Sequence, residues 1–570
     1  MIKRNLIIPF LLFFCLIPAR AQEKKQEAGL KREVTLYNPF KPSLSDVKKR
    51  SFLPEMNDTL KVTPDFHYEV KTEPFMPAYT VSPIKAAALL PDPLPKLYKS
   101  FINVGLGNYL TPLAEISITN ERSKKGAIGL YARHFSSNGY VELPINKKGF
   151  AGYMDNDASV FGRKFFRKNV FESSLDFAQK TRYAYGYDPA AATYSPAKKD
   201  IRRGYYSTGA KASLSSLTLD STSFSYKFDV FYNYLSTFSK LYQHNAGFKG
   251  MMAKSYNGFY VGSGIDYELF KHNDTIFNKT GFGIASISPF IKKSTEQWNF
   301  KLGFQAVLDE YLGTSSVFHL YPDVNFGFKV VPSYVSFFAG LSGKLEKNDP
   351  VKMFSENPYL RSDEFLFTQQ NTDHSLIVTT GLKGNTGLGG NYLASVKYSL
   401  IKNMLFYYTM DYPTLFMMGN TFDAMTDDVD LLQVHGEVSG VVTDKISYNG
   451  NINLYKYTLA NSSFAWNKPN WDAKLGVKYN LRDKILIGMD LSGIGARKFG
   501  VKNADFYKDP PLYNFGAPAH INLDLRAEYR YSKILSIWTK LDNISYNRNF
   551  EWAFYPSQRL LFMAGFTYSL

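Results

Sequence analysis

The stretch HFSSNG places a histidine and a serine two residues apart, at His134 and Ser136. On a β-strand, residues i and i+2 point to the same side, so the two side chains would stand together. A serine hydroxyl becomes a nucleophile when a neighbouring base takes its proton, and histidine is a common base. The pair is therefore compatible with hydrolysis, but a polar strand end that enters a loop explains it equally simply. We expect this second interpretation, with no catalytic residue and no enzymatic activity.

Other polar clusters in the sequence favour structure over chemistry. Oxygen-rich clusters can bind calcium, but the acidic stretch DAMTDDVD lacks the glycine and the terminal glutamate of an EF-hand loop. The eight histidines follow no HExxH or paired-ligand spacing. The sequence therefore predicts no metal site and no cofactor. It predicts a solvated outer loop for the four aspartates of the stretch, which are Asp423, Asp427, Asp428 and Asp430.

Strict alternation of apolar and polar residues indicates the elements that carry these side chains. In SFSYKFDVFYNYL and in INLDLRAEYRYS, every second residue is apolar or aromatic, whereas the residues between them are largely polar. This period of two is that of a β-strand with one apolar face. Many such segments are about 11 to 16 residues long, which exceeds the average soluble strand and suits a tilted strand that crosses a membrane. Inward-facing residues such as Asn522, Asp524 and Arg526 would give a wet lumen of mixed charge.

The lengths of the connections predict how the strands are joined. Short connections at 442–445, 481–484 and 531–533 alternate with long ones at 411–427, 460–469, 496–518 and 548–557. Bacterial outer-membrane barrels alternate short periplasmic turns with longer outer loops in this way. Residues 391–410 must form one long strand to preserve the alternation, although Lys402 and Asn403 resemble a turn. The fold class is therefore all-β, a transmembrane antiparallel barrel of about 22 strands with both ends in the periplasm.

Composition excludes a bundle of transmembrane helices. Aromatic residues make up 16% of the chain and charged residues 21%. After the first residues, no apolar run reaches the roughly 18 residues that a spanning helix requires. The formal net charge of +17 suits contact with anionic lipid head groups and lipopolysaccharide phosphate. Nucleic acid is not an expected partner because the chain carries an export signal.

The N-terminal region predicts export. A basic start (MIKRN), an apolar run and the small-x-small sequence Ala19-Arg20-Ala21 are typical of a secretory signal peptide over residues 1–21. This peptide contains the single cysteine, Cys15. Residues 22–95 hold ten prolines and no lasting periodicity, which indicates an irregular periplasmic or lumenal segment. The barrel is expected over residues 96–570, in the cell outer membrane.

The chain ends on an apolar strand, QRLLFMAGFTYSL, with no charge or proline to protect its edge. In a closed barrel, such a strand pairs with the first strand and leaves no free edge. The ending resembles the C-terminal signal read by the barrel-assembly machinery, with Gly565, Tyr568 and Leu570 at the matching positions. This resemblance implies that machinery as a partner during biogenesis.

The last stretch, LDNISYNRNFEWAFYPSQRLLFMAGFTYSL, resembles the end of TonB-dependent receptors. Residues from about 66 to 570 resemble TonB-dependent-receptor-like barrels of Bacteroidota, through PLPKLYKSFINVGLGNYLTPLAEISI, HFSSNG and FAWNKPNW. The resemblance implies a receptor or transport channel for an unidentified solute. Such receptors carry a plug of well over one hundred residues, and only about 75 precede this barrel, so a standard plug is not expected. DTLKVT resembles a TonB box, which implies TonB as a partner of Asp58, Thr59, Leu60 and Val62.

Two alternatives from other classes stay open at this point. The barrel could be a scaffold or assembly partner that docks a periplasmic or surface lipoprotein through residues 22–95 and through its loops. It could also be a lipid hydrolase, because outer-membrane phospholipases and lipid A deacylases use a His-x-Ser pair similar to His134 and Ser136. Those enzymes are barrels of roughly 8 to 12 strands, and this chain indicates one about twice as wide.

Overall fold

The computed structural model describes most of the chain beyond Tyr98. The described ranges are 98–120, 123–143, 147–186, 197–217, 224–273, 281–311, 315–361, 369–387, 389–411, 413–414, 417–418, 420–503 and 512–570. The expected signal peptide (1–21), the proline-rich segment (22–95) and the TonB-box-like residues lie outside the described residues, so those predictions stay predictions.

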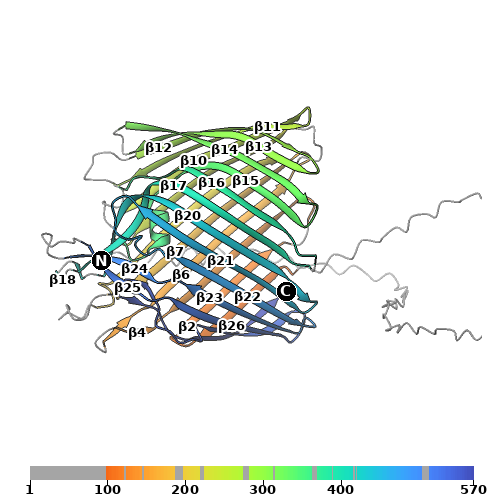
Figure 1. Ribbon diagram of the computed structural model, residues 1–570. Helices are drawn as coiled ribbons and strands as arrows, with labels where there is room; N and C mark the ends of the chain where they lie inside the picture. The colour runs from red at the N-terminus through yellow and green to blue at the C-terminus, as the bar shows by residue number, and fades with distance from the viewer. Residues whose placement is uncertain are drawn as a thin grey trace, which may run out of the picture. The chain divides into compact units, whose positions relative to one another are not determined.

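Within the described residues, one antiparallel sheet closes into a barrel (Figure 1). Of the 24 strands in this sheet, 22 form the closed wall, and β24 and β25 form a hairpin that pairs with the end of β17. Each wall strand pairs with the next along the chain, and the first pairs with the last, Phe101 opposite Ser569. The prediction of an all-β barrel of about 22 strands is confirmed. The wall strands are β1 (Ser100–Gly107), β2 (Thr111–Thr119), β3 (Gly126–Ser137), β6 (Tyr153–Phe165), β7 (Asn169–Tyr183), β8 (Arg202–Ser216), β9 (Ser225–Thr237), β10 (Tyr242–Tyr256), β11 (Phe259–His272), β12 (Gly281–Ser294), β13 (Trp298–Tyr311), β14 (Ser315–Val331), β15 (Val335–Glu346), β16 (Thr372–Asn385), β17 (Asn391–Asp411), β20 (Phe422–Thr443), β21 (Ile446–Leu459), β22 (Trp471–Leu481), β23 (Ile485–Ile494), β26 (His520–Arg530), β27 (Leu535–Asp542) and β30 (Leu561–Ser569).

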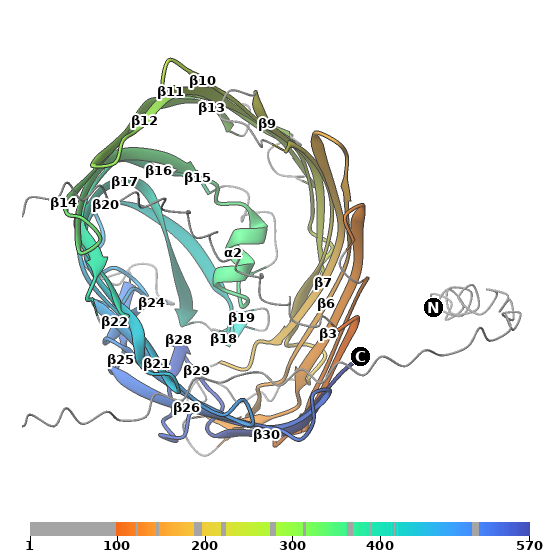
Figure 2. The same cartoon turned by 90° about the vertical axis from the view of Figure 1, so that its right-hand side faces the viewer.

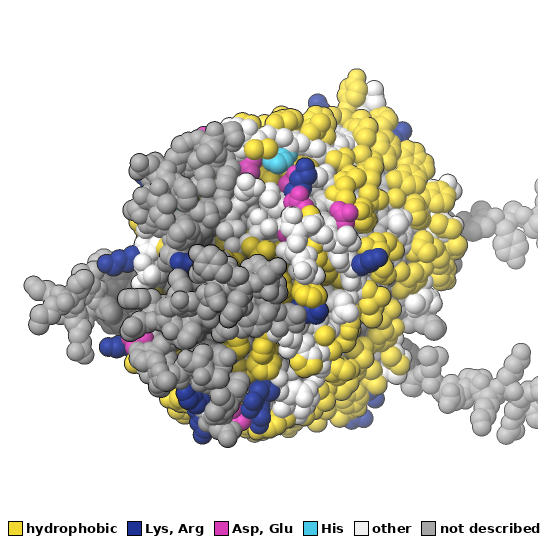
Figure 3. Space-filling model, turned by 60° about the vertical axis from the view of Figure 1, so that its left-hand side comes forward, with side chains coloured by type: hydrophobic (Ala, Val, Ile, Leu, Met, Phe, Trp, Pro, Cys, Tyr) yellow, Lys and Arg dark blue, Asp and Glu magenta, His cyan; other side chains and the backbone are white. Residues whose placement is uncertain are grey.

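Alternation along the strands separates an apolar outer face from a polar inner face. On β9, Val230 is 57% exposed on the outside, whereas its neighbour Asp229 faces Lys211 of β8 inside the lumen, 3.6 Å away. A wide apolar surface covers the side of the barrel (Figure 3). Because a soluble protein rarely exposes so large an apolar surface, this band is the face that lipid covers. None of the helices in the described part of the chain is long and apolar enough to cross a bilayer.

A tryptophan and two glycines close the seam between the last and first strands. Gly105 of β1 lies opposite Gly565 of β30, which in turn lies opposite Trp538 of β27. The Trp538 ring lies over both glycines, since a Cβ added to Gly105 would meet it at 2.5 Å and one added to Gly565 also at 2.5 Å. The Trp538 Nε1 then donates a hydrogen bond to Asn103 Oδ1 at 2.7 Å. The seam therefore requires glycine at both positions, because a side chain at either one would collide with the Trp538 ring.

Connections at the two ends differ as the sequence predicts. Short turns follow Thr443, Leu481 and Arg530. The start of β1 and the end of β30 lie at the same end of the barrel as these turns, where the backbones of Ser100 and Leu570 exchange two hydrogen bonds. Long loops lie at the other end, which we call the outer end because outer-membrane barrels place their longer loops outside the cell.

Strand β17 settles the ambiguous segment near residue 402. It runs unbroken from Asn391 to Asp411, which confirms the prediction of one long strand. Asn403 has a left-handed φ of 55°, and the pairing with β20 shifts register between Ile401 and Met404. A β-bulge there reproduces the local signature of a turn while the strand continues. The expected loop 411–427 is wrong in its length, because β20 already begins at Phe422.

Several outer loops carry elements that fold inward. In the view along the barrel in Figure 2, α2, β18, β19, β28 and β29 lie within the outline of the wall, together with the end of β17 and the start of β20, and Figure 1 shows β18 at the outer end. The parallel pairing of Tyr408 with Gly500 attaches the hairpin of β24 and β25 to the far end of β17. The loop elements are β4 (Tyr140–Glu142), β5 (Lys148–Phe150), α2 (Pro350–Glu356), β18 (Pro413–Thr414), β19 (Met417–Met418), β24 (Arg497–Asn503), β25 (Leu512–Ala517), β28 (Phe550–Trp552) and β29 (Tyr555–Pro556).

Candidate functional site

An apolar cluster lies at the outer mouth of the barrel. Its buried side chains come from outer loops that are hundreds of residues apart in the chain and from the end of β17 and the start of β20. No pairing of neighbouring strands requires these contacts. In a membrane barrel, the wall is stabilised by its own hydrogen bonds, so a second core at one end indicates a closure. We call this set the mouth cluster; it consists of Val141, Leu143, Ala151, Ala184, Tyr185, Ile201, Met353, Phe354, Tyr359, Leu360, Leu405, Tyr407, Phe422, Ala424, Phe499, Val501, Ala517, Trp552, Ala553, Phe554 and Tyr555.

Three tyrosines form the centre of the mouth cluster. The Tyr555 side chain is 1% exposed, with its ring centroid 3.9 Å from that of Tyr359 and 5.0 Å from that of Tyr185. Two of the hydroxyls donate hydrogen bonds inside the cluster: Tyr555 to the Asn420 carbonyl oxygen and Tyr185 to the Pro556 carbonyl oxygen. Asn420 Nδ2 donates to the Ala184 carbonyl oxygen at 2.7 Å. Four separate outer loops, those that carry Tyr185, Tyr359, Asn420 and Tyr555, are therefore linked at this point.

Burial also sets the ionisation of these three phenols. Desolvation raises the pKa of Tyr185, of Tyr359 and of Tyr555 above the ordinary value of 10.0. A raised pKa means that the packed state binds the phenol proton more tightly than the unpacked state does. The contribution is fully present below pH 10 and is lost as the pH rises from 10 toward the raised values.

We therefore expect ionisation of these phenols to loosen the mouth cluster in alkali. Amide hydrogen exchange of residues 550–558, corrected for the intrinsic rate, should show constant protection from pH 7 to about 10 and a progressive loss above that. The loss should be smaller in Tyr555→Phe, which removes one of the ionising phenols. Loss of protection already at pH 8, where the phenols are neutral in both states, would contradict this expectation.

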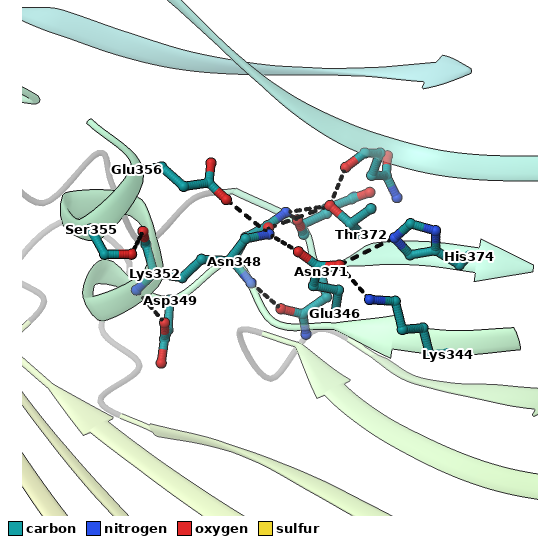
Figure 4. Close-up of polar contacts among 12 residues, drawn as sticks. Lys344, Glu346, Asn348, Asp349, Lys352, Ser355, Glu356, Asn371, Thr372 and His374 are labelled. Carbon is teal, nitrogen blue, oxygen red and sulfur yellow. Dashed lines mark hydrogen bonds and ion pairs between the residues drawn. The ribbon is translucent and has the colours of Figure 1, made fainter. Parts of the chain in front are cut away.

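A polar network connects the mouth cluster to the lumen wall through α2 (Figure 4). Asp349 caps this helix by accepting a hydrogen bond from the Lys352 backbone nitrogen at 2.9 Å. Lys352 Nζ lies 2.6 Å from Glu346 at the end of β15, and Glu346 also accepts from His374 of β16 at 3.2 Å. On its other side, α2 buries Met353 and Phe354 in the mouth cluster. Helix α2 is thus anchored to the wall by side-chain ion pairs and to the mouth cluster by apolar packing.

Below the mouth, the lumen is lined by ion pairs between neighbouring strands. Arg182 of β7 binds Asp155 of β6 through both terminal nitrogens, at 2.6 and 3.2 Å. Lys249 lies 3.1 Å from Glu268, which also pairs with Lys347 from the loop that carries α2. Lys249, Glu268 and Lys347 border a recess of about 640 Å³ in the inner wall. The expected wet lumen of mixed charge is therefore present, with the charges paired along the wall.

The acidic stretch expected as an outer loop lies in strand β20. Its carboxylates have structural partners: Asp427 accepts hydrogen bonds from Asn461 and from the Ser462 backbone nitrogen, and Asp428 accepts from the Asn403 backbone nitrogen in the bulge. Asp423 pairs with Arg361 at 3.3 Å. The loop prediction is wrong because these aspartates stabilise the inward bend of the β17 and β20 hairpin. No group of metal-binding side chains occurs in the described ranges.

The structure brings His134 and Ser136 together and adds a third residue. His134 Nε2 lies 3.0 Å from Ser136 Oγ, and His134 Nδ1 lies 2.6 Å from Asn156 Oδ1. Asn156 stands directly opposite His134 on the neighbouring strand β6. Sequence reasoning missed Asn156, since only the strand register brings a residue 22 positions away to the histidine.

The residues expected to carry the assembly signal all lie on the seam strand β30. Gly565 faces inward beneath Trp538, whereas Tyr568 and the 57% exposed Leu570 lie on the outer face. Tyr568 stands opposite Ile102 of the first strand. The location is consistent with the prediction, and the signalling role stays a proposal.

Comparison with known proteins bears on the fold. No protein-family model matches the sequence, and no curated protein does. Among solved structures, the FrpB iron transporter from Neisseria meningitidis superposes with a TM-score of 0.63 at 10% identity, over 84% of this chain and 82% of that one. The barrel has the fold of outer-membrane receptors. The pyoverdine outer membrane receptor FpvA from Pseudomonas aeruginosa PAO1 (TM-score 0.60, 11% identity, 84% and 79% covered) and the copper transporter OprC (0.59, 12%, 84% and 81%) are similar in the same way.

Proposed function

We propose that this barrel is an outer-membrane receptor or transport channel that admits a solute through its lumen when the mouth cluster opens. The observation that carries the proposal is the separate apolar core of the outer loops above a polar lumen. A barrel that served only as an anchor would gain nothing from a closure at its mouth. The structurally similar proteins are named for transport or reception, which supports this function over the scaffold alternative.

The closure also indicates where a solute would act. Tyr185, Tyr359 and Tyr555 meet from three loops, so a ligand that contacts any of these loops from outside changes the packing of the other two. Helix α2 would carry that change to Glu346 and the inner wall. We propose that solute binding at the outer surface loosens the mouth cluster.

We further propose that TonB energises the opening and that residues 22–95 occupy part of the lumen in place of a plug. The resemblance of Asp58, Thr59, Leu60 and Val62 to a TonB box supports the first proposal, and the proline-rich, aperiodic sequence of residues 22–95 supports the second. The positive net charge supports lipopolysaccharide as a neighbour of the barrel in the outer membrane.

A crosslinking experiment tests the energised mechanism. We expect a photoreactive amino acid at Thr59 to crosslink to TonB in living cells, and Leu60→Pro to reduce the product at least fivefold, because proline removes the backbone donor that strand pairing needs. The same photoreactive residue at Tyr531, in a turn between wall strands, is the control and should give no product. Absence of any product at Thr59, in cells where an established receptor crosslinks, would contradict the proposal.

A further inference from the structure

The hydrogen-bonded chain around Ser136 lies on the lipid-facing side of the wall. Ile128 and Leu130, on the same face of β3 as His134 and Ser136, are 63% and 40% exposed. Arg133, on the opposite face, reaches Asp157 and lines the lumen. The proposed solute path through the lumen therefore does not use His134, Ser136 or Asn156.

The position of His134 along β3 places these hydrogen-bonded side chains near the outer edge of the membrane. His134 lies eight residues beyond Gly126, at the short-turn end of the strand. At roughly 3.3 Å per residue and a tilt of about 40°, this is a rise of about 20 Å in an apolar band about 25 Å tall. The ester groups of outer-leaflet lipids lie at this boundary between hydrocarbon and water.

Hydrogen bonds link Asn156, His134 and Ser136 in the arrangement that activates a serine nucleophile. Asn156 Nδ2 donates to Gln179 Oε1 of β7 at 3.0 Å, which directs Asn156 Oδ1 toward His134 Nδ1. With the proton held on Nδ1, the Nε2 lone pair accepts the hydrogen of Ser136 Oγ at 3.0 Å. A base that is oriented by a third group is the common feature of serine and cysteine hydrolases, asparagine included.

We propose that Ser136, His134 and Asn156 form a hydrolytic site for the acyl esters of outer-leaflet lipids. His134 takes the Ser136 proton as Oγ attacks the ester carbonyl, and then gives that proton to the leaving alcohol, so that the acyl group is left on Ser136. Water attacks the acyl-serine, with His134 again as the base, and releases the fatty acid and the free serine. Asn156 is the positioning residue that keeps the histidine in the reactive tautomer. Leu106 and Leu110, 60% and 70% exposed next to this wall, provide apolar surface for the acyl chain.

A fluorophosphonate probe tests the site on the full mature protein, folded in detergent micelles. We expect the wild-type protein to be labelled at Ser136, Ser136→Ala and His134→Ala to lose the label, and Asn156→Ala to be labelled at least tenfold more slowly. Ser137→Ala is the matched control: this serine bonds Gln558 instead and should not affect labelling. Heat-modifiable migration on gels verifies that each variant folds.

Two substrates in mixed micelles then identify the ester. We expect the protein to release fatty acid from a glycerophospholipid or from an acylated glucosamine lipid, and Ser136→Ala to abolish the release. The substrate that is cleaved identifies the class of lipid that the site hydrolyses. No labelling and no release by a folded wild-type protein overturns it, as does labelling that His134→Ala leaves unchanged. Neither outcome affects the proposed transport function, because the lumen contains none of these residues.

Discussion

Replacing Tyr555 with alanine is expected to open the outer mouth. Removing a buried aromatic side chain costs about 3 to 5 kcal/mol, and Tyr555 also loses its hydrogen bond to Asn420 and its contacts with Tyr185 and Tyr359. Because the wall has its own hydrogen bonds, the loss falls on the loops and leaves the barrel folded. The population of open mouths should rise at least tenfold.

A cysteine in the lumen measures that population. The single cysteine of the chain lies in the expected signal peptide, so Lys211→Cys on the inner wall would be the only thiol of the mature protein. We expect a bulky, membrane-impermeant maleimide to label this cysteine on intact cells at least tenfold faster when Tyr555→Ala is present. Tyr531→Ala, which removes an exposed tyrosine from a turn at the other end, should leave the rate unchanged. Equal rates in all three proteins would show that the mouth cluster is not the barrier.

Replacing Gly565 with valine is expected to prevent closure of the barrel. A Cβ at this position would collide with the Val104 carbonyl oxygen and lie 2.5 Å from the Trp538 ring, and neither neighbour can move without breaking the seam. We expect the heat-modifiable folded form to fall at least tenfold, both in cells and after refolding from urea into detergent. Gly488→Val is the matched control, since the nearest atom to a Cβ there is Arg526 Cβ at 3.9 Å.

The refolding measurement separates packing from signalling at the C-terminus. Refolding into detergent involves no assembly machinery, so a failure there reports the seam alone. Tyr568→Ala, which leaves the glycine pair intact, should refold normally and lose folded protein only in cells if Tyr568 is part of the assembly signal. Normal refolding of Gly565→Val would contradict the role of the glycine pair at the seam.

The barrel wall could be predicted from the sequence because its signals are local. The period of two in β9 and β26 fixes which residues face lipid, and the alternation of short and long connections fixes the direction of each strand. Asn403 misleads only because a bulge and a turn use the same left-handed backbone. These features follow from neighbours along one strand or from the requirement that a barrel has no edge.

The mouth cluster and the grouping of Ser136, His134 and Asn156 could not be predicted, because their contacts are between distant segments. Tyr185, Tyr359 and Tyr555 have no local pattern that distinguishes them from the many tyrosines of the wall. Asp423 and Asp427 resemble a loop in isolation and belong to a strand only because β17 offers them partners. Asn156 meets His134 through the register of two strands, which depends on the whole sheet.

Single-channel conductance in a planar bilayer tests the central claim most directly. Four proteins are compared: the mature chain, the chain without residues 22–95, the chain with Tyr555→Ala, and the chain with both changes. Because we propose two barriers, residues 22–95 in the lumen and the mouth cluster above it, we predict silence from the mature chain and a large, salt-dependent conductance from the double variant. The two single variants should give smaller or intermittent currents. Silence from all four folded proteins would mean that the wall side chains seal the lumen, which would contradict a transport path through this barrel.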